Sequence, residues 1–184
     1  MPATMEHKLV NGRWRWQPTS SGGGGGTSGL YESYAKISNQ LANDAYEGGT
    51  TADTTHQRGL NTEDFDPDGI VSISNNEFTL AAGTYYLKYS MPFYKCGYAF
   101  GHIYNVTDSA VVANSYTSSS LASTSLAGQQ GHIEGSCRLT ITGSKAFKVN
   151  MYASHARASS GLGYRANESG VPSVYTQVEI WKEA

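Results

Sequence analysis

Apolar and polar side chains alternate along short segments of this 184-residue chain, from residue 30 almost to its end. In residues 84–91 the apolar side chains fall at Tyr85, Leu87, Tyr89 and Met91, with other residues between them. A period of two puts one set of side chains on each face of an extended strand. Eight such segments occur, at residues 30–38, 77–81, 84–91, 98–106, 110–117, 134–142, 145–154 and 173–182. The pattern predicts eight antiparallel strands.

The composition agrees with an all-β fold. Tyr occurs 13 times and Gly 21 times, charged residues make up only 15% of the chain, and Ser and Thr fill many positions between apolar ones. Such a composition is poor in helix formers and rich in residues that suit strands and turns.

Two weaker extended pieces are expected at residues 57–61 and 70–74. The length allows one sandwich domain with about thirty residues in front of it.

The connections between the eight segments differ in length by their position in the series. Those after the second, fourth and sixth segments are short and contain turn formers, at residues 82–83, 107–109 and 143–144. Those after the first, third, fifth and seventh are longer, at residues 39–76, 92–97, 118–133 and 155–172. In an up-and-down sandwich the longer connections then share the end opposite the two termini. This end is predicted to display variable loops.

The first residues predict a separate anchor. Asn11-Gly12 between two β-prone arms is typical of a two-residue hairpin turn. Residues 1–21 are therefore expected to be an N-terminal arm with a hairpin, followed by a glycine-rich linker at residues 22–29 and a knob domain at residues 30–184. A lone hairpin is marginally stable, so its apolar residues should dock on a partner. These anchor residues are Leu9, Val10, Trp14 and Trp16. The alternative is a disordered tail.

Charge and hydropathy exclude several classes of function. The formal net charge of −2 gives no broad positive field, so no nucleic-acid partner is expected. No segment reaches the roughly 18 apolar residues of a membrane span, and the start has no apolar run typical of a signal peptide. We expect no membrane insertion and no export. Cys96 and Cys137 are then expected to be free thiols, buried as small apolar residues.

A calcium loop is one possible interpretation of an acidic segment. Asp64, Asp66 and Asp68 alternate ahead of Gly69, as at the start of an EF-hand loop. The twelfth position is Asn75 instead of the bidentate Glu that such loops use. An acidic surface turn is the alternative, and no metal or cofactor is predicted.

Candidate catalytic groups are scattered through the pattern. His102 lies on a predicted strand, whereas His132 and His155 lie in or beside different loops. Nucleophilic catalysis needs a nucleophile, a base and an orienting acid together. Glu134 and Glu168 lack the surroundings that would make them a glycosidase pair. The prediction is that the chain is not an enzyme.

The predicted loop end has the composition of a recognition surface. Tyr together with Ser, Gly, Asn and Arg combines rigid aromatic area with small polar donors. The same composition also describes ordinary loops. The residues predicted to face a receptor are Tyr94, Lys95, His155, Arg157, Tyr164, Arg165 and Asn167.

Three segments together resemble a known fold family. Residues 77–87 contain Phe78 and the run Gly83-Thr84-Tyr85-Tyr86, and they are followed by the strands at residues 98–106 and 174–181. This combination resembles the C1q/TNF-like jelly roll, an eight-stranded antiparallel sandwich. The resemblance implies a compact homotrimer. The last strand carries β formers on both faces, which fits a strand covered by the core on one side and by a partner subunit on the other.

A narrower resemblance concerns residues 60–69, 102–109 and 179–182. They are similar to the C-terminal domains of bacteriophage tail fibres and other virion appendages. That resemblance implies a virion protein at the particle surface, on the tail or the capsid, whose knob attaches to a glycan or protein of the host cell and whose N-terminal arm contacts other virion proteins. A capsid head fibre or decoration protein with a mainly structural role is the alternative. A glycan-cleaving tailspike is a third candidate.

Overall fold

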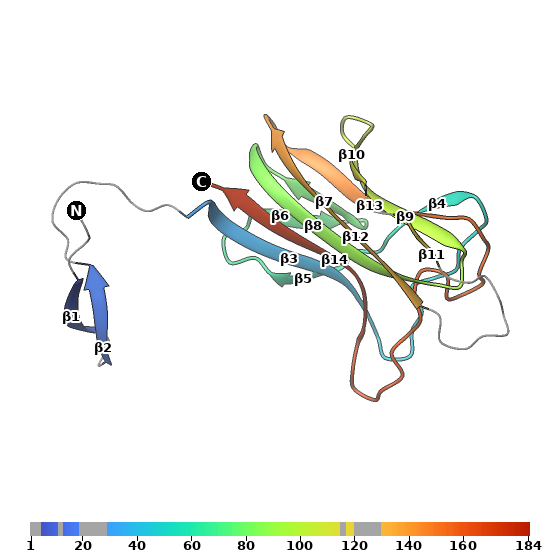
Figure 1. The fold of residues 1–184 in the computed structure, drawn as a ribbon, viewed down its shortest axis with the longest axis horizontal. Helices are drawn as coiled ribbons and strands as arrows, with labels where there is room; N and C mark the ends of the chain where they lie inside the picture. The colour runs from blue at the N-terminus through green and yellow to red at the C-terminus, as the bar shows by residue number, and fades with distance from the viewer. Residues whose placement is uncertain (1–4, 11–12, 19–28, 115–116, 120–129) are drawn as a thin grey trace.

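The computed structural model describes residues 5–10, 13–18, 29–114, 117–119 and 130–184. Two stacked antiparallel sheets form the main body (Figure 1). The first sheet has the order β12 (Gln130–Ile141), β8 (Gly83–Tyr94), β14 (Ser173–Glu183), β3 (Tyr31–Leu41) and β5 (Thr62–Phe65). The second has the order β10 (Ala110–Asn114), β9 (Tyr98–Asn105), β13 (Lys145–Ala153), β7 (Glu77–Leu80) and β6 (Val71–Ser74). The prediction of an antiparallel β-sandwich is confirmed.

Four short strands complete the described structure. β11 (Ser118–Ser119) pairs with β9, and β4 (Thr54–Gln57) pairs with β13. β1 (Met5–Val10) and β2 (Arg13–Pro18) form a separate antiparallel pair, in which Leu9 lies opposite Trp14. The expected pairing of the N-terminal hairpin is therefore present, while its turn at residues 11–12 and the linker at residues 22–28 lie outside the described residues.

Several predicted boundaries were wrong. The extended piece predicted at residues 57–61 is mainly a crossing between sheets, because β4 belongs to the second sheet and β5 to the first. The strand predicted at residues 110–117 corresponds to β10, which ends at Asn114 and pairs with the far part of β9, whereas β11 follows the predicted segment and pairs with the first residues of β9. The loop predicted at residues 92–97 shrinks to three residues, since β8 continues to Tyr94 opposite Gln130.

The strand order also differs from an up-and-down arrangement. Of the eight strands predicted from the sequence, only β9 and β10 are neighbours both along the chain and within a sheet. The other connections between these strands cross from one sheet to the other. Strand directions still alternate, so the ends of the sandwich can be assigned from the pairing registers.

The registers place three of the predicted connections at one end. Leu41 lies opposite Ser173, Tyr94 opposite Gln130, and Ala153 opposite both Thr54 and Ala99. The connections at residues 42–53, 95–97 and 154–172 therefore leave the sheets together, and we call this the loop end. At the other end the Ala184 amide donates to the Leu30 carbonyl at 3.4 Å. Both chain ends of the sandwich thus lie opposite the loops (Figure 1).

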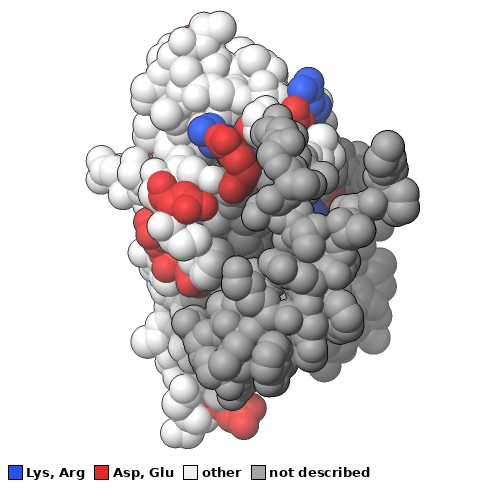
Figure 2. All heavy atoms as spheres, turned by 90° about the vertical axis from the view of Figure 1, so that its left-hand side faces the viewer, with Lys and Arg blue, Asp and Glu red and all other residues white. Residues whose placement is uncertain are grey.

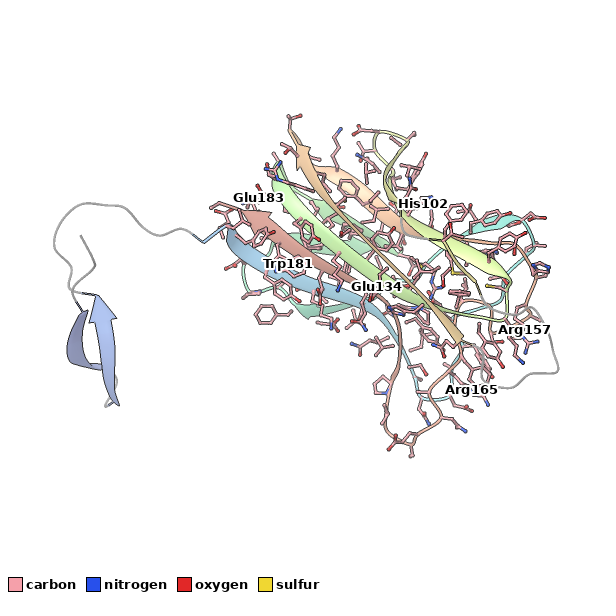
Figure 3. The ribbon with its side chains drawn as sticks, in the orientation of Figure 1. His102, Glu134, Arg157, Arg165, Trp181 and Glu183 are labelled. Carbon is pink, nitrogen blue, oxygen red and sulfur yellow. The ribbon has the colours of Figure 1, made fainter. Side chains whose placement is uncertain are left out.

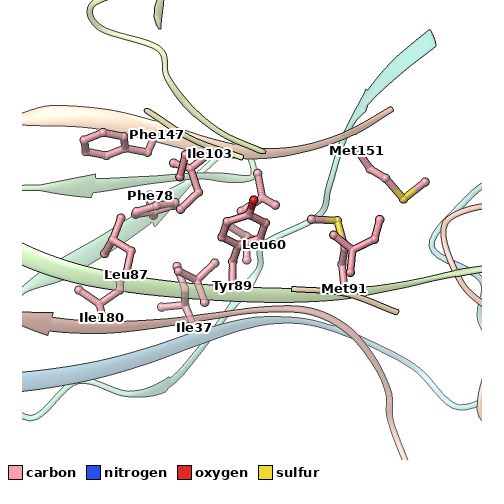
Figure 4. Close-up of a cluster of buried hydrophobic side chains, with 14 of the residues drawn as sticks. Ile37, Leu60, Phe78, Leu87, Tyr89, Met91, Ile103, Phe147, Met151 and Ile180 are labelled. Atoms are coloured by element: carbon pink, nitrogen blue, oxygen red, sulfur yellow. The ribbon is translucent and has the colours of Figure 1, made fainter. Parts of the chain in front are cut away.

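The core fills the space between the two sheets (Figure 4). The alternating positions of β8 supply Tyr85, Leu87, Tyr89 and Met91, each at most 1% exposed. From the opposite sheet, the rings of Phe78 and Phe147 stack at 5.5 Å; the other labelled core residues are Ile37, Leu60, Ile103, Met151 and Ile180. Burying each large apolar side chain contributes roughly 1.5–3 kcal/mol. The residues that alternate with a period of two in the sequence are thus the ones whose side chains face this core.

Candidate binding surface at the loop end

Three tyrosine rings form a continuous chain at the loop end. Tyr46 meets Tyr164 edge-on with 5.5 Å between ring centroids, and Tyr164 lies 4.9 Å from Tyr94. Tyr164 is 45% exposed, whereas Tyr94 is buried. A hydrogen bond with Tyr164 raises the pKa of Tyr46 above its ordinary value. The rings therefore support one another, and Tyr164 presents their accessible surface.

Three cations lie against these rings. The Arg165 guanidinium is 4.5 Å from the Tyr46 centroid, while Arg157 lies 5.4 Å and the Lys95 ammonium 5.3 Å from the Tyr94 centroid. Cations within about 6 Å of an aromatic face are attracted by its negative charge density. We call the set of Tyr46, Tyr94, Lys95, Arg157, Tyr164 and Arg165 the loop-end cluster; Figure 3 labels its two arginines.

A fully buried arginine holds the loops beneath this cluster. Arg58 donates from Nη1 to the Pro92 carbonyl at 3.0 Å, from Nη2 to the Leu162 carbonyl at 2.6 Å, and from Nε to the Thr176 hydroxyl at 3.1 Å. It also forms an ion pair with Glu47. Burial lowers the pKa of Arg58, and the Glu47 carboxylate opposes this effect. We call these five residues the Arg58 clamp.

The clamp sets the positions of the rings above it. Three of the groups that Arg58 binds are each within two residues of a cluster tyrosine, namely Tyr46, Tyr94 and Tyr164. Buried charged groups need such partners, because an unpaired one would cost several kcal/mol. The clamp therefore joins one strand end and two connections that are far apart in the sequence.

Backbone hydrogen bonds pair the two long connections directly. Thr50 and Arg157 exchange two bonds, of 2.9 and 3.0 Å, as an isolated antiparallel bridge. The Asp44 amide donates to Ala166 at 3.0 Å, and the Leu162 amide donates to Gly48 at 3.1 Å. Loops whose backbone groups are satisfied in this way have few alternative conformations. The loop-end cluster thus rests on a fixed base.

The structure brings together five of the seven residues predicted to face a receptor. Tyr94, Lys95, Arg157, Tyr164 and Arg165 belong to the cluster. The other two do not contact its rings: His155 is exposed, with its Nδ1 2.9 Å from the Ser154 hydroxyl, and Asn167 is exposed on the 154–172 connection.

Sequence reasoning missed three residues of this region. Tyr46, Glu47 and Arg58 lie in the stretch at residues 39–76, which was predicted as one long connection with two weak extended pieces. Their spacing follows neither strand nor helix periodicity, and no local pattern marks Arg58 as buried. The role of Arg58 follows from contacts between distant parts of the chain, such as those with Leu162, 104 positions away, and Thr176, 118 positions away.

The candidate catalytic residues lie in separate settings. His102 contacts the Asn150 side chain at 3.1 Å on β9 and β13, and burial lowers its pKa. His132 lies 3.3 Å from Glu134 on β12, where both side chains are more than half exposed. His155 contacts Ser154. The hydrogen bonds and ion pairs of the described residues give none of these histidines the triad of nucleophile, base and acid.

The acidic segment forms a turn with local partners. Asp66 accepts hydrogen bonds from the Ile70 and Val71 amides at 2.9 and 3.0 Å. Asp64 accepts from Ser38 and Gln40 side chains on β3 instead. Within the described ranges, no three His, Cys, Asp or Glu side chains come together to hold a metal ion. In the same residues, no helix has the length and hydrophobicity to cross a membrane.

The sequence matches no family model and no curated protein. The structure, however, is similar to crystal structures of murine APRIL, with TM-scores of 0.54 at pH 5.0 and 0.52 at pH 8.0. Sequence identity is 9%, and the match covers 82% of this chain and 98% of APRIL. The globular domain of zebrafish complement 1qA protein matches with a TM-score of 0.45 and 13% identity, over 81% of this chain and 95% of that one. The chain therefore has the TNF-like jelly-roll fold of APRIL.

Proposed function

We propose that this chain is a homotrimeric attachment module of a bacteriophage virion, with its loop end directed at the host cell. The observation that carries the proposal is that a preorganised cluster of aromatic and cationic side chains lies opposite both chain ends of the sandwich. A chain held at Leu30 would therefore extend the cluster outward. The role is one of binding and not of catalysis.

The homotrimer is proposed from the exposed face of the first sheet. Trp181 lies at the centre of an aromatic group there, with ring centroids 5.2 Å from Tyr34, 5.7 Å from Tyr86 and 6.2 Å from Tyr31. Phe65, at 5.9 Å from Tyr34, is 52% exposed. We call these five residues the aromatic sheet face. Tyr31 and Phe65 are exposed, whereas Tyr34, Tyr86 and Trp181 are half-buried. Contiguous aromatic rings that remain accessible on the outer face of a β-sheet suit a protein interface.

A groove and unpaired charges continue this face toward the loop end. The groove is lined by Tyr86, Lys88, Asn114, Glu134 and Ser136. Lys88 lies opposite Glu179 in the sheet register, but the described residues form no ion pair between them. A second copy that packs its edge into the groove would cover both the rings and these charges. The prediction that β14 is covered on both faces would then hold.

The opposite end of the sandwich has a different surface. Figure 2 views the end that carries Leu30 and Ala184, where the coloured part of the surface shows more acidic than basic area. The proposal directs this end toward the particle and assigns attachment to the arm at residues 1–21. Within the arm, Leu9, Val10, Trp14 and Trp16 supply the apolar contacts with other virion proteins.

Antibody labelling and adsorption tests check the proposal. Antibodies against residues 30–184 should label intact particles by electron microscopy, and their Fab fragments should reduce adsorption to host cells. Free chain should also compete with particles, but only at high concentration, because many knobs per particle multiply the affinity of the particle. Labelled particles that adsorb normally in the presence of saturating Fab would support a capsid decoration role instead.

A further inference from the structure

Two cations of the loop-end cluster have no ion-pair partner among the described residues. Arg165 forms an ion pair with Asp44, whereas Arg157 and Lys95 form ion pairs with no carboxylate among the described residues. The undescribed residues 115–116 and 120–129 include no Asp or Glu in their sequence. The cluster therefore carries two positive charges that its own loops leave uncompensated.

Lys95 is the more unusual of the two. The residue as a whole is only 4% exposed, although its Nζ is not one of the described buried side-chain atoms that lack a hydrogen-bond partner. Its contact in the described structure is the Tyr94 ring, 5.3 Å from Nζ. Its backbone has a φ of 50°, in the left-handed region that a lysine rarely adopts. The left-handed backbone and the lack of an ion-pair partner among the described residues make Lys95 a candidate binding residue.

Arg157 offers a hydrogen-bonding group suited to a planar acid. Its Nε donates to the Ser160 hydroxyl at 3.3 Å, while Nη1 and Nη2 have no acceptor in the described part of the chain. A guanidinium binds carboxylates with two parallel hydrogen bonds. The backbone of Arg157 is held by its bridge to Thr50, so the group is positioned before any ligand arrives.

The adjacent Tyr164 ring supplies an apolar surface. It is 45% exposed, lies 4.9 Å from Tyr94, and is supported edge-on by Tyr46. The C–H groups on one face of a sugar ring pack against such a ring because the aromatic face is electron-rich. Cations beside an aromatic ring match the two chemical features of a carboxylated sugar, namely its negative charge and the C–H face of its ring.

We infer that the loop-end cluster binds an acidic glycan through a uronate residue. Arg157 holds the carboxylate, Lys95 supplies the second positive charge, and Tyr164 packs against a sugar ring. The inference rests on the proposed attachment function and names the class of receptor. The cluster has only two cations without an ion-pair partner in the described residues, and the chain as a whole has a net charge of −2. The site is therefore better matched to a single carboxylate than to a polyanion such as nucleic acid.

Calorimetric titration of the full chain with defined oligosaccharides provides the test. Trigalacturonate should bind, and the affinity should fall as salt is raised. Maltotriose, a neutral trisaccharide, should bind at least about tenfold more weakly, because it offers no partner for Arg157. A carrageenan tetrasaccharide, which carries sulfate groups but no carboxylate, and a tetraglutamate peptide are the other two arms. Equal or tighter binding of either would overturn the assignment to a carboxylated sugar.

Variants locate the site. R157K keeps the charge but loses the planar group, and K95Q and Y164A remove the other two contacts; each should weaken trigalacturonate binding by about tenfold. The matched control is K148Q, since Lys148 lies over the Tyr104 ring at 5.4 Å on the second sheet. Circular dichroism checks that each variant is folded. Unchanged affinity in folded R157K and Y164A would overturn the proposed site.

Binding of labelled chain to host cells separates this inference from the proposed function. If the chain binds cells but trigalacturonate does not compete and R157K binds normally, the glycan assignment is wrong while attachment stands. If the chain binds trigalacturonate but not host cells, the site is correct and the attachment function is wrong. If the chain binds neither trigalacturonate nor host cells, both the glycan assignment and the attachment function are wrong.

Discussion

Arg58 and Glu47 form an ion pair buried beneath the loop-end cluster, joining the end of β4 to the connection at residues 42–53. Glu47 also accepts a hydrogen bond from the Gly59 amide at 2.8 Å. Each of the two buried charges is the counter-ion of the other. Replacing either residue alone would therefore leave a buried charge without its ion-pair partner.

Arg58→Met should therefore be strongly destabilising. It leaves Glu47 without its counter-ion and removes four further hydrogen bonds, to Pro92, Met151, Leu162 and Thr176, so we expect a loss of about 3–5 kcal/mol in the free energy of unfolding. The double variant Arg58→Met, Glu47→Met should recover part of that loss, because no lone charge remains. Urea denaturation measures both. A double variant no more stable than the single one would contradict the importance of the unpaired charge.

Gly163→Ala should disturb the same region through the backbone. Gly163 has a φ of 134°, and a Cβ there would lie 2.8 Å from the Tyr175 ring and 2.9 Å from Pro92. We expect a loss of about 1–3 kcal/mol on denaturation. Gly143→Ala is the control, since a Cβ at Gly143 meets no neighbouring atom. Equal stability of the two variants would show that the connection at residues 154–172 adapts freely.

His102 should make stability depend on pH. Burial, with a smaller effect of Lys148, holds the pKa of His102 below the ordinary 6.5. As pH falls below 6.5, the unfolded chain takes up a proton that the folded chain resists, so the folded state loses stability. Denaturation at pH 7.5 and pH 5.5 should show a larger loss in the wild type than in His102→Gln. An NMR titration giving a pKa above 6.5 would contradict this sign.

Trp181→Glu should separate the proposed subunits. It places a charge in the middle of the aromatic sheet face, which the homotrimer would bury. Light scattering should give three times the chain mass of 19.8 kDa for the wild type and a lower mass for the variant. Tyr98→Glu is a matched control, because Tyr98 is 58% exposed on β9 in the other sheet. A wild-type monomer at micromolar concentration would reject the trimer.

The two cysteines should react slowly in the folded chain. Both are free, and burial raises the pKa of Cys96 and of Cys137 to about 11 from the ordinary value of 9.0. Because only the thiolate reacts, each cysteine should hold about a hundredfold less thiolate at pH 8 than an unperturbed thiol. Iodoacetamide labelling followed by mass spectrometry should therefore be slow until guanidinium is added. Rapid native labelling of Cys96 would contradict its burial.

Local patterns were sufficient for much of the fold. The alternation of Tyr85, Leu87, Tyr89 and Met91 predicted β8, because a half-buried strand imposes that period. Tyr164 and Arg157 lie in one connection between strands, and strand direction alternates along the chain. These two facts were sufficient to predict that both residues lie near Tyr94. These predictions depend only on neighbours along the chain and on strand direction.

Long-range contacts account for what was missed. Tyr46 joins the cluster because Glu47 is held by Arg58, and five separate segments supply the acceptors of the buried Arg58. No spacing in the sequence encodes such a convergence. Likewise, the end of β8 was predicted as loop, since the extension to Tyr94 depends on pairing with Gln130. Sequence patterns reveal local periodicity, whereas the burial of Arg58 and the length of β8 are set by contacts between distant segments.

The adjacency of Leu30 and Ala184 has a mechanical consequence. A pull between the arm and a ligand held at the loop end would run along the length of β3, which lies beside β14 through residues 31–41. Such a load acts in shear, so many backbone hydrogen bonds between the two strands must break together instead of one after another. The same arrangement that directs the loops outward should make this module resist force along its long axis.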